Sequence, residues 1–361
     1  MAESMAKLPK RTFEIEQTEL ILGNSNSNFS GVTSTMLQNL PYQLKHMNVM
    51  VMGKHHIDNA EYILTFWQAV KLCFTFPENG KNRIFHARRN NEMIQALVLK
   101  YVFFAKIKIV FTSTAQRHHS KFTRLLMNKM DAIISTCTMA AQYLRNKPDM
   151  IIAHGIQTEV YCPVQNKRQI FEQFNIKTSH CVGIFGRVRS QKGVDLFVDA
   201  HLEVLKTNKH ITAIICGAIL PSEMTFVEEL EHKIKQHNLQ DRIVFLGEQP
   251  FESIPKIIAS MDLVCALSVN EGFGLTVLEA LSSQVPVVAT NAGAWKDIIV
   301  EEKNGFVVDV GSASQLIEKL EYCYSNLNQL KSMGEHGRAH ILQNYKVEHE
   351  AKSLCDFFRG L

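Results

Sequence analysis

Short β-branched runs alternate with amphipathic helical patterns through the second half of this 361-residue chain. The runs predict strands at residues 181–185, 211–216, 243–246, 263–267 and 285–289. The helical patterns between and after them cover residues 194–205, 225–236, 254–260, 275–283 and 313–324. Strands separated by helices of this length form βαβ units around a parallel sheet. The pattern therefore predicts an open α/β fold.

The first half of the chain shows the same alternation less regularly. It predicts strands at residues 49–52, 84–85, 107–111, 132–134 and 150–153, with helices at 33–45 and 94–104. The periodicity lapses around residues 162–168, where we place a linker, and residues 330–361 read as a helical tail. We therefore expect two α/β domains, each with a ligand crevice at the carboxyl ends of its strands.

The charge of the chain is divided unevenly between these halves. The whole chain carries 39 Lys and Arg against 35 Asp and Glu, a net charge of +4. Residues 1–165 carry 19 basic and 11 acidic residues, so the first half is +8 and the remainder is −4. An anionic ligand or a membrane surface would suit the basic half. The small net charge and the lack of a repeated aromatic–basic pattern argue against a nucleic-acid partner.

Eight cysteines are present, and none forms a C-x-x-C pair. Most lie in apolar runs, which is typical of buried free thiols rather than of a disulfide framework or a zinc site. Residues 1–11 are polar, and the most apolar stretch, residues 96–111, contains three lysines. We therefore expect a cytoplasmic protein, attached at most peripherally to the inner membrane.

Residues 186–193, GRVRSQKG, follow a predicted strand and precede a predicted helix. The amides at a helix N-terminus attract anions, and Arg187 and Lys192 would hold a diphosphate there. A solvated basic loop is the alternative interpretation. The segment is not a Walker loop, and the chain contains no G-x-G-x-x-G dinucleotide motif.

Residues 270–280, NEGFGLTVLEA, form a second strand-to-helix connection with two carboxylates. Seven residues separate Glu271 from Glu279, a spacing of about two helical turns that would place both on one side of a helix. Gly272 and Gly274 would leave amides open to an anion. Carboxylates that accept sugar hydroxyls beside such amides suit a nucleotide sugar, and a loop followed by an ordinary acidic helix is the alternative.

This segment resembles the E-x7-E motif of the family-four retaining glycosyltransferases, which have the GT-B fold. Residues 154–158 are similar to the family's HGVD turn, and residues 186–193 to its phosphate loop. Residues 262–263, 286–290 and 292–294 are similar to further parts of its carboxyl-terminal domain. Residues 30–35 and 85–93 resemble the mannosyltransferases of lipopolysaccharide core assembly, so the likeness extends over nearly the whole chain.

The resemblance implies two Rossmann-like parallel-sheet domains that face each other across a cleft. Residues 1–165 would bind the acceptor, residues 166–340 would bind the nucleotide sugar, and a helix at 341–361 would cross back to the first domain. Two departures exist: the loop at residues 23–31 lacks the family's paired glycine, and Gln284 replaces a residue that is usually small.

The resemblance also implies a role for individual residues. Arg187 and Lys192 would neutralise the donor diphosphate, Glu271 would contact the hydroxyls of the transferred sugar, and Glu279 would contact the ribose. His86 would lie against the transferring sugar, and Gly31 would let its loop approach the phosphate. Further donor contacts would come from Glu248 and Gln249 near the nucleobase, and from Gly272, Phe273, Gly274, Leu275 and Thr276 along sugar and phosphate.

These residues permit transfer without a metal, because two protein cations would stabilise the charge on the leaving diphosphate. The chain also contains no D-x-D carboxylate pair, the motif that would hold a metal ion. The resemblance implies GDP-mannose as the donor, which is a co-substrate, so we expect no cofactor. The resemblance implies retention of configuration by front-face attack, with His86 orienting the sugar or relieving charge.

The acceptor side of the prediction rests on a basic segment. Arg88 and Arg89, followed by Glu92, would bind an anionic acceptor such as a Kdo carboxylate or a lipid A phosphate, unless they form a solvated face. Residues 117–130 mix basic and apolar positions at helical spacing and would lie on an anionic membrane, with Phe122, Leu125 and Leu126 touching lipid. An ordinary helix that faces the core is the alternative.

The function expected is thus transfer of mannose from GDP-mannose to the inner core of lipopolysaccharide, on a Kdo–lipid A type of acceptor. A UDP-hexose-dependent transferase acting on another glycolipid or glycan is the first alternative. A nucleotide-sugar-binding protein without turnover is the second.

Overall fold

The computed structural model describes residues 8–28 and 30–361, so Phe29 of the loop at residues 23–31 lies outside the described residues. Contacts divide the described chain into two units. The N-terminal unit comprises the residues up to Gly155 together with Val347–Leu361, and the C-terminal unit comprises Ile156–Lys346. These divisions fall near the expected domain ends at residues 165 and 340.

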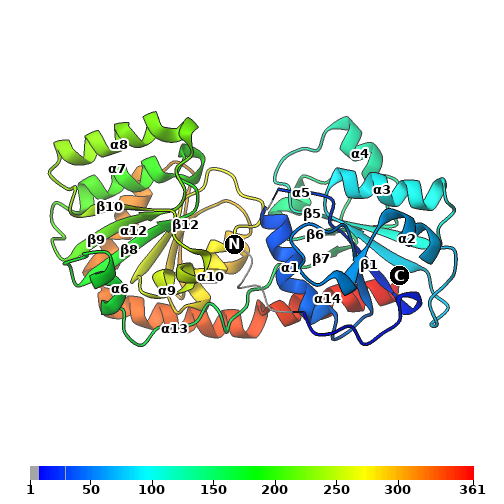
Figure 1. Ribbon diagram of the computed structural model, residues 1–361. Coiled ribbons are helices and arrows are strands. Elements are labelled where there is room, and N and C mark those ends of the chain that lie inside the picture. Colours follow the sequence, from blue (N-terminus) through cyan, green and yellow to red (C-terminus); the bar gives the residue numbers. More distant parts are fainter. Residues whose placement is uncertain (1–7, 29) are drawn as a thin grey trace. The chain divides into compact units, whose positions relative to one another are not determined.

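The N-terminal unit is built on a seven-stranded sheet in the order β3-β2-β1-β4-β5-β6-β7, with every neighbouring pair parallel (Figure 1). Its strands are β1 (Leu20–Gly23), β2 (Val49–Met52), β3 (Ile63–Leu64), β4 (Arg83–Ala87), β5 (Ile107–Ser113), β6 (Ala132–Ser135) and β7 (Met150–Ile151). Its helices are α1 (Gly31–Gln43), α2 (Phe66–Leu72), α3 (Asn90–Tyr101), α4 (Lys121–Met127), α5 (Thr138–Gln142) and α14 (Val347–Gly360).

The C-terminal unit contains a six-stranded parallel sheet in the order β10-β9-β8-β11-β12-β13. Its strands are β8 (His180–Phe185), β9 (Ile211–Cys216), β10 (Ile243–Gly247), β11 (Leu263–Ala266), β12 (Val287–Thr290) and β13 (Gly305–Val308). Its helices are α6 (Arg168–Gln173), α7 (Val194–Val204), α8 (Met224–Gln236), α9 (Ile254–Ala259), α10 (Thr276–Ser282), α11 (Trp295–Ile298), α12 (Ala313–Ser325) and α13 (Leu327–Asn344). The prediction of two parallel-sheet α/β domains is confirmed.

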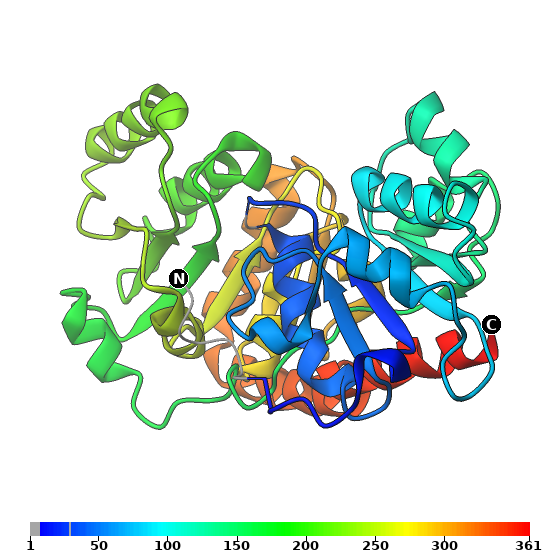
Figure 2. The same cartoon turned by 45° about the vertical axis from the view of Figure 1, so that its right-hand side comes forward.

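Helices cover both sheets because the strands are apolar on both faces, as parallel strands are. In the C-terminal unit, α7 packs against α8 and α12, whereas α10 packs against α9, α11 and α13. In the N-terminal unit, α14 (red in Figures 1 and 2) packs on α1, and Leu354, Cys355 and Phe358 join the core beneath it. The two sheets therefore have separate cores.

The predicted helical tail at residues 330–361 consists of two helices, because the helix is interrupted between α13 and α14. At the break, the Tyr345 carbonyl accepts a hydrogen bond from the Ile156 amide at 2.8 Å, and Lys346 forms an isolated bridge with Ile156. This pairing ends α13, and α14 then begins at Val347.

All eight cysteines are free thiols, and seven of them are buried, as predicted. Over residues 8–28 and 30–361, no helix is both long enough and apolar enough to cross a bilayer.

Candidate functional site

The C-terminal unit has a switch point between β8 and β11, where the strand order reverses direction. Ligands of open α/β sheets bind at the carboxyl ends of strands at such a point. The two motifs predicted from the sequence follow these two adjacent strands. The fold therefore brings residues 186–193 and 267–275 together at one edge of the sheet.

The two loops are joined by hydrogen bonds to backbone carbonyls. The Val269 amide donates to the Gln191 carbonyl at 2.9 Å, and the Gln191 side chain donates to the Asn270 carbonyl at 3.3 Å. Gly193 adopts a positive φ of 72° as it begins α7, and a Cβ there would lie 2.2 Å from the Leu267 carbonyl oxygen. Only glycine permits this approach without a shift of the backbone.

Lys192 and Glu271 meet where these loops touch. The Lys192 ammonium forms an ion pair with the Glu271 carboxylate, and both side chains are largely buried. The Ser268 hydroxyl donates to the same carboxylate at 3.3 Å. Arg187 lies in the first loop and is exposed. A cation, a carboxylate and an exposed guanidinium are thus available at the switch point.

Glu279 lies on α10 and is hydrogen-bonded to Tyr161. Burial raises the pKa of the Glu279 carboxyl to about 7, although the Tyr161 hydrogen bond and the charge of Lys192 both act to lower it. The prediction that Glu271 and Glu279 share one side of a helix is wrong, because α10 begins at Thr276 and Glu271 lies in the preceding loop. Lys192 nevertheless interacts with both carboxylates.

A turn before α11 holds the glycine loop in place. The Trp295 indole donates to the Gly274 carbonyl at 2.8 Å, and the Ala294 amide donates to the Phe273 carbonyl at 2.9 Å. The Phe273 side chain is buried, so only the backbone of this residue faces a possible ligand. Gly272, Leu275 and Thr276 complete the loop and are half-buried.

The residues predicted near a nucleobase lie farther along the sheet. Glu248 and Gln249 follow β10, which β9 separates from β8. Glu248 is exposed, and the Gln249 amide donates to the Leu246 carbonyl at 2.6 Å. Their proximity to a base stays a prediction.

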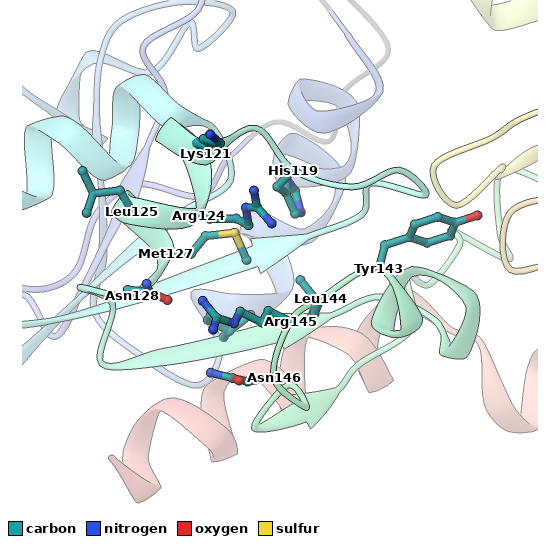
Figure 3. Close-up of a pocket in the computed structure, with 11 residues that line it drawn as sticks. His119, Lys121, Arg124, Leu125, Met127, Asn128, Tyr143, Leu144, Arg145 and Asn146 are labelled. Carbon is teal, nitrogen blue, oxygen red and sulfur yellow. The ribbon is translucent and has the colours of Figure 1, made fainter.

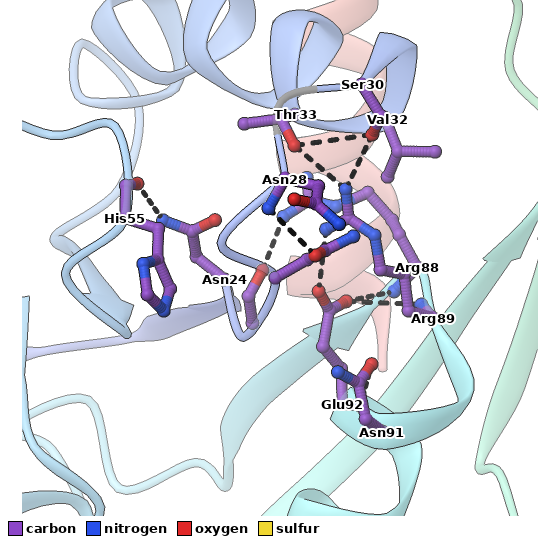
Figure 4. A network of polar contacts seen from close by, with 12 residues as sticks. Asn24, Asn28, Ser30, Val32, Thr33, His55, Arg88, Arg89, Asn91 and Glu92 are labelled. Atoms are coloured by element: carbon purple, nitrogen blue, oxygen red, sulfur yellow. Dashed lines mark hydrogen bonds and ion pairs between the residues drawn. The ribbon is translucent and has the colours of Figure 1, made fainter.

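In the N-terminal unit, Glu92 is the centre of an internal polar network (Figure 4). It accepts hydrogen bonds from the amides of Arg88 and Arg89, at 2.7 and 3.2 Å, and forms an ion pair with the Arg89 guanidinium. Arg89 also donates to the hydroxyls of Ser30 and Thr33, both at 2.8 Å. The network therefore ties the start of α3 to the start of α1.

Glu92 and Arg89 are engaged in contacts within the N-terminal unit, and the acceptor roles expected for them stay predictions. Glu92 is fully buried, and both of its carboxylate oxygens already accept hydrogen bonds. Arg88 is half-buried and donates to the Gly23 carbonyl at 3.1 Å, while its Nε has no partner among the described residues. Gly31 is exposed at the start of α1, and a Cβ there would meet nothing within 4 Å.

His86 also lies inside the N-terminal unit rather than on its surface. Its Nε2 is hydrogen-bonded to the Thr112 hydroxyl at 2.7 Å, and its ring packs edge-on against Phe358 of α14. Burial, then the charge of Arg88, holds the pKa of the His86 imidazole well below its usual range. The ring is 2% exposed, and its expected contact with a transferred sugar stays a prediction.

Tyr161 and Trp295 were not predicted from the sequence. Tyr161 falls just before the predicted linker, and no local pattern joins it to Glu279 far along the chain. Trp295 follows the Ala292-Gly293-Ala294 turn, where a large ring after small residues was a usable sign of close packing. Within the part of the chain that the structure describes, no three His, Cys, Asp or Glu side chains are grouped to hold a metal ion.

Comparison with known proteins identifies the family. Residues 166–340 match the family described as Glycosyl transferases group 1. The chain is 33% identical to the lipopolysaccharide core biosynthesis mannosyltransferase LpcC of Rhizobium leguminosarum bv. viciae, over 96% of this chain and 98% of the relative.

Two solved structures are also similar. The C-terminal domain of a group 1 glycosyl transferase (LpcC) from Francisella tularensis is 36% identical, covers 53% of this chain and 99% of its own, and has a TM-score of 0.51. Anabaena HepE in complex with UDP and glucose is 18% identical over 95% of this chain and 100% of its own, with a TM-score of 0.79, a likeness of fold. The chain belongs to the group 1 glycosyl transferases, the family-four glycosyltransferases of the GT-B fold.

Proposed function

We propose that this glycosyltransferase moves mannose from GDP-mannose to the inner core of lipopolysaccharide, with retention of configuration and without a metal. The observation that carries the proposal is the meeting of Lys192 and Glu271 at the switch point, beside the exposed Arg187. The relatives named lipopolysaccharide core mannosyltransferases support the choice of sugar and acceptor. A Kdo–lipid A type of molecule is the proposed acceptor.

Lys192 and Arg187 have the charge that the leaving diphosphate requires. Negative charge accumulates on the diphosphate as the glycosidic bond breaks, and fixed cations stabilise that charge more in the transition state than in the ground state. When Lys192 turns to the phosphates, it releases the Glu271 carboxylate. Glu271 is then free to accept hydrogen bonds from the hydroxyls of the mannose.

Glu279 would accept hydrogen bonds from the ribose hydroxyls. Tyr161 already orients this carboxylate, so little rotamer freedom is lost on binding. On the acceptor side, the half-buried Arg88 is the candidate for an anionic group of the inner core, because Arg89 and Glu92 are already paired. His86, whose ring is buried, stays the residue proposed to orient the transferred sugar.

A panel of nucleotide sugars tests the proposal. The purified protein is incubated with GDP-mannose, UDP-glucose or UDP-galactose, with and without a truncated inner-core acceptor, in buffer containing EDTA. Release of GDP that depends on acceptor, and an α-linked product by NMR, would support the proposal. Turnover with a UDP-sugar alone would favour the first alternative, and binding without release would favour a non-enzymatic binder.

A further inference from the structure

The N-terminal unit contains two hollows of different kinds. The larger has a volume of about 290 Å³ and lies between α4 and the segment that follows α5 (Figure 3). Lys121, Arg124 and Asn146 line it and are exposed, so bulk water satisfies their polar groups. Leu126 of α4, which was expected to touch lipid, is buried in the core instead. The smaller hollow, the His86 cavity, has a volume of about 20 Å³, and most of the side chains that line it are buried.

Four side chains that line the His86 cavity have polar atoms without a hydrogen-bond partner among the described residues. These atoms are Nδ2 and Oδ1 of Asn39, Nδ1 of His86, Oγ1 of Thr136 and Nε of Arg88. Asn39, His86 and Thr136 are each at most 3% exposed. A polar group that is buried without a partner costs free energy, and native proteins rarely contain one. Such atoms grouped around one cavity therefore indicate a bound molecule.

The size and the chemistry of the His86 cavity select this molecule. A volume of about 20 Å³ holds one water but no larger group. Asn39 presents both a donor and an acceptor, and the Thr136 hydroxyl can act as either. A halide would satisfy only the donors and would meet the Glu350 carboxylate, whereas a metal cation would satisfy only the acceptors and would meet the Arg88 guanidinium. Water both donates and accepts, so it fits the whole set.

We propose that the His86 cavity holds one ordered water, which is hydrogen-bonded to Nδ1 of His86 and to the side chains of Asn39 and Thr136. The imidazole is then held on three sides, because its Nε2 is hydrogen-bonded to Thr112 at 2.7 Å and its ring packs edge-on against Phe358. Asn39 and Thr136 are therefore positioning residues for His86.

The same cavity brings α14 next to His86. Glu350 of α14 lines it, and the Glu350 carboxylate accepts hydrogen bonds from Nδ1 of His154 and from the Gly155 amide, both at 2.8 Å. Burial, then the charges of Arg88 and His154, lowers the pKa of His86, so the imidazole beside the water is neutral. The orientation of His86 is thus set inside the N-terminal unit before any substrate binds.

This inference does not depend on the proposed glycosyl transfer, and its test uses no catalytic readout. Crystals of the full chain, with and without a bromide soak, provide the direct test. We expect one peak of solvent density within about 3.2 Å of Nδ1 of His86 and of Asn39 or Thr136, and no anomalous bromide signal at this place. A cavity without density, or a bromide peak inside it, would overturn the proposal.

Thermal unfolding of variants tests the water in solution. Thr136→Val keeps the shape of the side chain and removes the hydroxyl, so the loss of its bond to the water should lower the melting temperature of the N-terminal unit by about 2–4 °C. Thr75→Val, at an exposed position of the same unit, should change it by less than about 1 °C. A rise in the melting temperature of Thr136→Val would overturn the proposal, because it would show that the buried hydroxyl has no partner.

The ring nitrogens of His86 report whether Asn39 and Thr136 position this residue. In protein with nitrogen-labelled histidine, His86→Gln identifies the NMR signals of His86. Asn39→Ala and Thr136→Val should each shift the Nδ1 signal, whereas Asn146→Ala, in the larger and open hollow, should leave it unchanged. If the Nδ1 signal is the same in the wild type and in both cavity variants, while thermal unfolding shows that these variants are folded, the proposed water link is incorrect.

Discussion

Replacement of Gly274 by alanine should destabilise the C-terminal unit through two separate effects. Gly274 has a φ of 82°, and an alanine in this left-handed region costs about 1–2 kcal/mol. A Cβ at this position would also lie 2.3 Å from Nε1 of Trp295 and 2.8 Å from Cγ of Glu271. Overpacking of this kind costs about 1–3 kcal/mol, so the total loss should be about 2–5 kcal/mol.

Gly311→Ala separates the two effects. Gly311 has a φ of 76° in the same unit, but a Cβ there would meet nothing within 4 Å. This variant should therefore lose only the 1–2 kcal/mol of the backbone effect. The difference between the two variants measures the close packing of Gly274 against Trp295 and Glu271.

Urea unfolding followed by tryptophan fluorescence provides the assay. The chain has two tryptophans, and Trp295 is 2% exposed whereas Trp67 is 64% exposed. In a Trp67→Phe background the signal comes from Trp295 alone and reports the loop directly. If Gly274→Ala and Gly311→Ala have the same free energy of unfolding, the packing of the loop against Trp295 described above is incorrect.

Two further predictions concern buried carboxylates. Glu279 has a raised pKa, so in the free protein its ionisation lowers the free energy of unfolding as pH rises from about 4.5 to about 7. In urea unfolding, Glu279→Gln should therefore have the same free energy of unfolding as the wild type near pH 4 and a value about 1–3 kcal/mol higher at pH 8. A constant difference between the two proteins across this pH range would contradict the raised pKa. Glu92→Gln breaks the network around Arg89 and should lower the free energy of unfolding of the N-terminal unit by about 2–4 kcal/mol. The control Asp58→Asn, at an exposed carboxylate, should change this free energy by less than about 0.5 kcal/mol. Equal effects of the two substitutions would show that the network does not stabilise the unit.

The sequence predicted most of the fold because alternation of short apolar runs and helices is a local property. Three strands were missed: β1, a run of only four residues, β3, a run of two residues, and β13, which comes before α12 without a strong pattern. The break between α13 and α14 was also missed, since it depends on a hydrogen bond between Tyr345 and the distant Ile156. Long-range pairing of this kind leaves no periodic signal.

The candidate site was predicted in part for the same reason. Lys192 and Glu271 lie in loops that follow strands, which the sequence predicted, and the order of strands in the sheet brings these two loops together. Burial was harder to predict, because Glu92 and His86 are polar residues in a motif and nothing in the sequence shows that they face inward. Tyr161 and Trp295 act through contacts with residues far away in the chain, which only the fold reveals.

Calorimetric titration of GDP-mannose into the full chain and its Lys192→Ala variant shows whether Lys192 holds the donor diphosphate. We expect saturable binding to the wild type and an affinity about 10- to 100-fold weaker in the variant, because the variant lacks the ammonium group that would hydrogen-bond to the diphosphate. Lys206→Ala, at an exposed lysine of the same unit, should bind as the wild type does. Equal affinity of the Lys192→Ala variant and the wild type, or no heat with either, would contradict the assignment of the diphosphate to the switch point between β8 and β11.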